Sequence, residues 1–87
     1  MTTSQDNILL AKQFGMIFTE YYSVVKYFAF MLLKSEEDAE DIAQDVFTKL
    51  WTQPEIWTKV PNLKPYVYTL TKSTTLNFIK HKKIELA

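Results

Sequence analysis

The 87-residue sequence predicts an all-α fold, a compact bundle of three to four helices. Hydrophobic residues recur at spacings of three and four along most of the chain, which is the period of an α-helix. The composition is 47% hydrophobic and 15% aromatic, with one glycine and three prolines. Such a composition is typical of a packed helical domain rather than a disordered chain. The length leaves room for one domain, which we take as residues 1–87.

The first helical stretch is expected at about residues 7–33. Its apolar residues cover so much of the helix circumference that we expect contact with more than one neighbour. Gly15 or the Tyr22–Ser23 step could interrupt the stretch, so one bent helix and two shorter helices both fit the sequence. The longest uninterrupted apolar run, Tyr27–Leu33, is too short to span a bilayer. We therefore expect no membrane insertion and, because the N-terminus has no export signal, a cytoplasmic protein.

The second helix is expected over residues 35–53. Ser35 is a candidate N-cap, and Asp38 three residues later approximates a capping box. Acidic residues in the first turn complement the helix dipole, and the helix must end before Pro54. Its predicted buried face consists of Ala39, Ile42, Ala43, Val46, Phe47, Leu50 and Trp51.

A loop is expected over residues 54–62, which contain two prolines. A short helical turn around Ile56–Trp57 fits this segment. Trp57 has the features of a hydrophobic clamp, which we favour over a base contact.

The last helix is expected over residues 63–83, with Asn62 as a candidate N-cap and Pro65 tolerated in the first turn. Its predicted inward stripe is Leu63, Tyr66, Val67, Leu70, Thr74 and Phe78. Leu76 and Ile79 lie off this stripe. They either pack against the first helical stretch, which we expect, or are exposed.

The formal net charge of zero hides a separation of charge along the chain. Residues 36–45 contain six acids, whereas residues 56–84 contain six lysines, Lys83 among them, and no acid. These regions are either two solvated helix faces or two surfaces for different partners, the basic one suited to nucleic acid. On the second helix the polar face consists of Asp41, Gln44, Asp45 and Thr48. On the last helix the outward lysines and hydroxyls suit phosphates, and an exposed Tyr68 offers a ring to an unstacked base.

No pattern in the sequence indicates catalysis. The chain has no cysteine, which excludes disulfides and thiolate metal sites, and its single histidine, His81, excludes a multi-histidine site. A glycine-rich phosphate loop is missing, and the acid spacing lacks the pattern of a calcium-binding loop. We therefore expect no enzyme, no metal site and no cofactor.

Residues 38–51, with the sequence DAEDIAQDVFTKLW, resemble the AED-x-x-Q-[DE]-x-F core of region 2.2 of sigma factors. Upstream, Phe14, Tyr21–Tyr22 and Phe28–Ala29 resemble region 2.1. Downstream, residues 62–70 resemble the segment that precedes the DNA-reading helix of the family. Over about residues 10–83 the chain is thus similar to region 2 of the extracytoplasmic-function (ECF) group of sigma-70 factors.

The resemblance implies a bundle of the region 2 type, with residues 7–33 as region 2.1, 35–53 as region 2.2 and 63–83 as regions 2.3 and 2.4. It implies a transcription initiation factor domain that docks on core RNA polymerase and recognises and melts the −10 promoter element. The expected contacts to the β′ clamp helices of the polymerase are Asp41, Gln44, Asp45 and Thr48. The expected contacts to the non-template single strand of promoter DNA are Trp57, Lys59, Asn62, Tyr66, Tyr68, Lys72, Ser73 and Lys80.

The sequence departs from the family pattern in two respects. Where the family commonly has an Arg-Asn pair, this chain has Lys72–Ser73, and it contains no arginine. Lysine lacks the bidentate fork of arginine, so contacts mostly to phosphate are expected. The helix-turn-helix domain for the −35 element, region 4, is absent from these residues.

Two other readings fit the same residues. The first is a protein-interaction module that binds an anti-sigma factor or similar partner without recognising DNA. The second is a structural bundle that dimerises through its aromatic surface.

Overall fold

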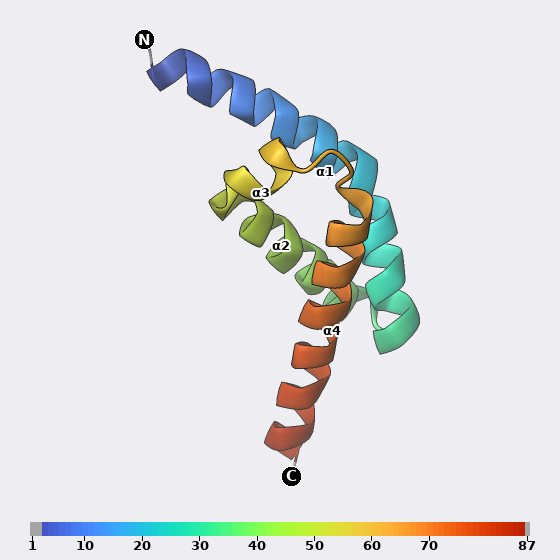
Figure 1. Ribbon diagram of the computed structural model, residues 1–87. Helices are drawn as coiled ribbons and strands as arrows, with labels where there is room; N and C mark the ends of the chain where they lie inside the picture. The colour runs from blue at the N-terminus through green and yellow to red at the C-terminus, as the bar shows by residue number, and fades with distance from the viewer. Residues whose placement is uncertain (1–2, 87) are drawn as a thin grey trace.

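The computed structural model describes the backbone of residues 3–86 and the side chains of residues 8–82. This part of the chain forms four α-helices and no strand, so the predicted all-α fold is confirmed (Figure 1). The side chain of Lys83, part of the basic region, lies outside the described residues. The body measures 54 × 21 × 21 Å, because the N-terminal end of the first helix and the end of the last one extend past the bundle.

Helix α1 (Thr3–Leu33) is one continuous helix of 31 residues, which decides between the two alternatives for this stretch. Near its middle the Thr19 hydroxyl donates to the Gly15 carbonyl oxygen at 2.8 Å. Such a bond to the preceding turn is compatible with a helix and tends to bend it, and α1 is curved in Figure 1. The helix ends at Lys34, whose φ of 57° is left-handed and whose N–H donates to the carbonyl oxygen of Phe30 at 2.7 Å.

Helix α2 (Glu36–Thr52) begins at the predicted cap. The Ser35 hydroxyl oxygen accepts a hydrogen bond from the Asp38 N–H at 3.3 Å. Six residues of the predicted apolar face are buried, but Trp51 is 47% exposed, so its prediction as a core residue is wrong. Its ring lies at the margin of the face, against Phe14 of α1, with 5.0 Å between ring centroids.

Helix α3 (Pro54–Lys59) occupies the expected position of the short turn, and helix α4 (Lys64–Leu86) follows. The Asn62 side-chain oxygen accepts a hydrogen bond from the Lys64 N–H at 3.3 Å and so satisfies one free donor at the start of α4. Leu76 of α4 is 50% exposed, which contradicts the expectation that it packs against α1. Leu76 lies opposite the buried side of the helix, whereas Ile79 is half-buried.

The core lies where α1, α2 and α4 meet. Its buried apolar residues are Val25, Ala29, Ala39, Ile42, Ala43, Val46, Phe47, Leu50, Trp57, Leu63 and Val67. The hydroxyl groups of two buried threonines of α4 donate hydrogen bonds to carbonyl oxygens of the preceding turn. Thr71 donates to Val67 at 2.7 Å, and Thr75 donates to Thr71 at 2.8 Å. Burial of these polar groups therefore leaves no donor unpaired.

The segment Ile8–Leu33 of α1 is long and apolar enough to cross a membrane by length and composition, although its longest uninterrupted apolar run is short. Only 11% of its most apolar window is buried. A core helix of a globular protein can meet the same criterion of length and composition, and Val25 and Ala29 of this helix belong to the shared core.

Candidate functional site

The polar face of α2 is exposed along its length. Asp41, Gln44, Asp45 and Thr48 are all exposed, as the helical period predicts. They share α2 with the buried Ile42, so a packed helix presents them at fixed spacing.

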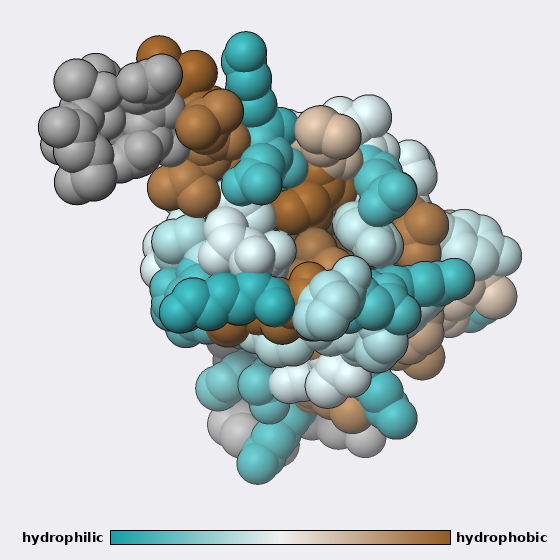
Figure 2. Space-filling model, turned by 45° about the horizontal axis from the view of Figure 1, so that its top comes forward, coloured by the Kyte–Doolittle hydropathy of each residue, from teal (hydrophilic) through white to brown (hydrophobic). Residues whose placement is uncertain are grey.

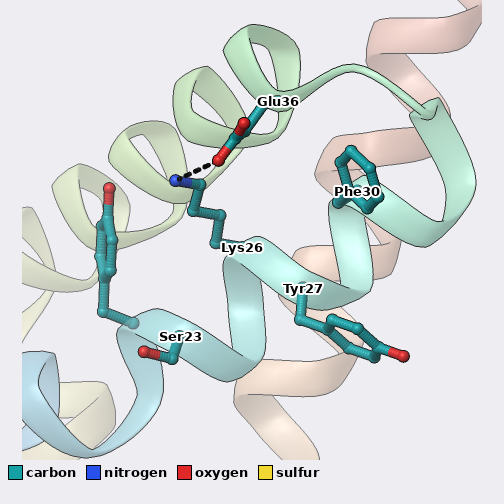
Figure 3. Close-up of a pocket in the computed structure, with 6 residues that line it drawn as sticks. Ser23, Lys26, Tyr27, Phe30 and Glu36 are labelled. Carbon is teal, nitrogen blue, oxygen red and sulfur yellow. Dashed lines mark ion pairs between the residues drawn. The ribbon is translucent and has the colours of Figure 1, made fainter.

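The acids of α2 divide into two groups. Lys26 of α1 lies 3.6 Å from the Glu36 carboxylate (Figure 3) and 4.0 Å from that of Glu40. Among the described side chains, Asp41 and Asp45 take part in no ion pair. Their carboxylates therefore face solvent outside any ion pair, as a surface for a basic partner requires.

An exposed aromatic margin adjoins this polar face. Phe14, Phe18, Gln44, Phe47, Thr48 and Trp51 line a hollow of about 350 Å³ between α1 and α2. The exposed fractions of Phe18 and Trp51 are 41% and 47%. Sequence reasoning missed both residues as surface features, because their helical positions fit a buried stripe equally well.

The outward side of α4 carries the predicted basic face. Lys72, Ser73 and Lys80 are exposed and project from one continuous helix. Lys82 is held differently: its ammonium nitrogen lies 3.9 Å from the Asp38 carboxylate and 5.6 Å from the centre of the Phe78 ring. Three polar side chains of α4 are thus available to a phosphate backbone, whereas Lys82 links α4 to the start of α2.

The predicted DNA residues near the start of α4 lie in different environments. Lys59 and Asn62 are exposed, and Tyr66 is half-buried. Tyr68 is 37% exposed and packs edge-on against Phe28 of α1. The ring centroids are 6.0 Å apart and the angle between the ring planes is 68°. Its ring therefore has a supported position at the surface, as a base-stacking side chain needs.

Trp57 is buried, with an exposed fraction of 5%. Its indole Nε1 donates to the carbonyl oxygen of Leu50 at 2.6 Å, and its ring lies 5.9 Å from that of Phe14. Trp57 is therefore the hydrophobic clamp that we favoured from the sequence. The ring offers no free face to a base, so we do not include Trp57 among the proposed DNA contacts.

A pocket of about 290 Å³ lies between α1 and α4, beside the basic face. Its lining residues are Glu20, Tyr21, Val24, Lys64 and Tyr68. Burial raises the pKa of the Tyr21 phenol, and the charge of Glu20, with its hydrogen bond from this phenol, raises the pKa further. Of these residues, only Tyr68 was predicted from the sequence as a site residue, because the pocket joins two helices that are far apart in the sequence.

Comparison with models of protein families identifies the family of this chain. The model of the family "Sigma-70 region 2" matches residues 17–84, which include the C-terminal half of α1, all of α2 and α3, and α4 up to its last turn. No curated protein and no solved structure matches the chain at a significant level.

Proposed function

The chain belongs to the sigma-70 region 2 family of transcription initiation factor domains, which bind RNA polymerase and melt promoters, and on that premise we propose how its two charged faces divide these tasks. The acidic face of α2 docks on core RNA polymerase, and the basic face of α4 holds single-stranded −10 promoter DNA. We further assign the chain to the ECF group and to the cytoplasm.

The docking assignment rests on the free carboxylates of α2. Asp41 and Asp45 are exposed and take part in no ion pair among the described side chains, whereas Glu36, Asp38 and Glu40 are each paired with a lysine. We assign these two residues, with Gln44 and Thr48, to the β′ clamp helices. The neighbouring aromatic hollow, with Trp51 at its rim, adds an apolar contact beside the charges. Charges at the edge of an interface give specificity and a fast association rate, and aromatic side chains add binding energy.

The DNA assignment rests on the composition of the α4 surface. Lys72 and Lys80 provide positive charge to the phosphates, and the Ser73 hydroxyl a hydrogen bond. Tyr68 and Tyr66 provide rings, and Lys59 and Asn62 border the start of the helix. Since no acid occurs from residue 56 to residue 84, no carboxylate on this segment repels the phosphates.

Binding to purified core RNA polymerase tests the docking assignment. We expect Asp45→Lys to weaken binding roughly tenfold, since it places a like charge against a basic partner. The matched control is Glu55→Lys, the same change on the exposed side of α3. Equal affinity of both variants and the unmodified domain for core polymerase would contradict the assignment.

A further inference from the structure

The outward side of α1 carries a stripe of exposed residues that no other helix covers. This outer stripe consists of Leu9, Lys12, Met16, Glu20, Ser23 and Tyr27. Their numbers differ by three, four or seven, so they lie on one side of the helix. Leu9, Met16 and Tyr27 are 57%, 73% and 65% exposed. Figure 1 shows α2, α3 and α4 gathered on one side of α1, and Figure 2 shows hydrophobic residues exposed on the surface.

The centre of the stripe has the residue spacing of a helix-packing hole. Lys12, Gly15, Met16, Thr19 and Glu20 border an open hollow of about 720 Å³. The first four have the spacing i, i+3, i+4 and i+7, which is the set that surrounds a knob from a facing helix. At Gly15 a Cβ atom would meet nothing within 4 Å, so the floor of the hollow is open to a second backbone.

The charges in the stripe identify the facing helix. Lys12 lies four residues before Met16 and Glu20 four residues after it, about 6 Å away along the axis in each direction. If a second α1 packs antiparallel with Met16 at the two-fold axis, each Lys12 lies opposite the Glu20 of the other copy. A parallel arrangement would instead place like charges together. Neither side chain has an ion-pair partner among the described residues.

We propose that α1 is a self-association surface, on which a second copy of this chain packs antiparallel about Met16. The Met16 side chain of each copy fills the hollow of the other, and two Lys12–Glu20 pairs set the register. The interface is isologous, because the same stripe serves on both copies. A contact made by one helix from each copy is small, so the dimer is weak and reversible. The stripe lies on α1, away from the polar face of α2, so the proposal is independent of polymerase docking.

Sedimentation equilibrium of the full chain, from micromolar to millimolar concentration, tests this proposal. We expect the unmodified chain to dimerise, and Lys12→Glu or Glu20→Lys to weaken the dimer roughly tenfold, since each replaces two attractions with two repulsions. The double variant K12E/E20K restores opposite charges across the axis and should recover most of the affinity. Matched controls are Lys59→Glu and Glu55→Lys on α3, which should leave the association unchanged.

Several outcomes would overturn the proposal. A chain that stays monomeric over the whole concentration range has no such interface. A double variant as weak as the single variants excludes the antiparallel register, and controls that weaken equally indicate a nonspecific charge effect. Met16→Glu places two negative charges against each other at the two-fold axis and should abolish the dimer. Circular dichroism verifies that this exposed substitution leaves the helices intact.

Discussion

The indole nitrogen of Trp57 donates a hydrogen bond to the main-chain oxygen of Leu50 at 2.6 Å, and both residues are buried. This bond ties α3 back against the end of α2. The segment with Lys59 and Asn62 follows directly, so the bond helps to set where these residues lie relative to α4. The clamp thus connects the stability of the core to the geometry of the proposed DNA face.

Trp57→Phe should lower the free energy of unfolding by about 2 kcal/mol or more, because it removes the donor and leaves part of the buried indole volume unfilled. The Leu50 carbonyl oxygen keeps one partner, because it also accepts from the Gln53 N–H at 3.2 Å. Urea denaturation measures the change. Tyr27→Phe, at an exposed ring, is the control and should have little effect. Equal stability of the Trp57 variant and the unmodified chain would show that the bond does not stabilise the fold.

Ser35→Ala should lower the free energy of unfolding by about 1 kcal/mol, because the Asp38 N–H loses its acceptor at the start of α2. Ser23→Ala is the matched control, since Ser23 is exposed inside α1, where alanine is the better helix former. Thermal melts of both variants provide the comparison. If Ser35→Ala had the same melting temperature as the control, the Ser35 cap would not stabilise α2.

The effect of Tyr21 on stability should disappear at high pH. Burial, followed by the charge of Glu20 and the hydrogen bond to it, raises the pKa of this phenol, so the folded chain favours the neutral form. The stabilisation is fully present below the pKa of the unfolded state, about 10, and is lost as pH rises through the folded pKa.

The difference in unfolding free energy between the unmodified chain and Tyr21→Phe should therefore be constant from about pH 8 to about pH 9 and shrink as the pH rises from about 10 to about 11. Denaturation at each pH measures it, and because both proteins keep the other tyrosines, those groups cancel. A constant difference over this range would indicate that the pKa of Tyr21 is not raised.

Lys72→Glu should weaken binding of a labelled single-stranded −10 oligonucleotide and reduce its salt dependence. Each phosphate contact on a single strand contributes about 0.7 to the slope of log affinity against log salt, so the slope should fall by at least that much. Fluorescence anisotropy across a salt series measures both quantities. Lys34→Glu, an exposed lysine at the corner between α1 and α2, should change neither. Identical slopes for both variants would exclude Lys72 from phosphate contact.

Features that depend on short stretches of chain were predictable. The cap at Ser35, the break at Pro54 and the exposure of Asp41 and Asp45 follow from local bonding and from the helical period. The resemblance at residues 38–51 led to the family, which the match over residues 17–84 confirms.

Other features depended on how the helices meet. The helical period gives the direction of a side chain around its own axis, but it does not give the extent of the neighbouring helix. Trp51 and Leu76 were therefore expected inside and lie half exposed, while Lys82 is drawn to Asp38 across a long sequence separation. The pocket that joins Glu20 to Tyr68 and the uncovered stripe of α1 have the same origin. Burial at the edge of a helix is decided by the packing partner, and that partner is distant in the sequence.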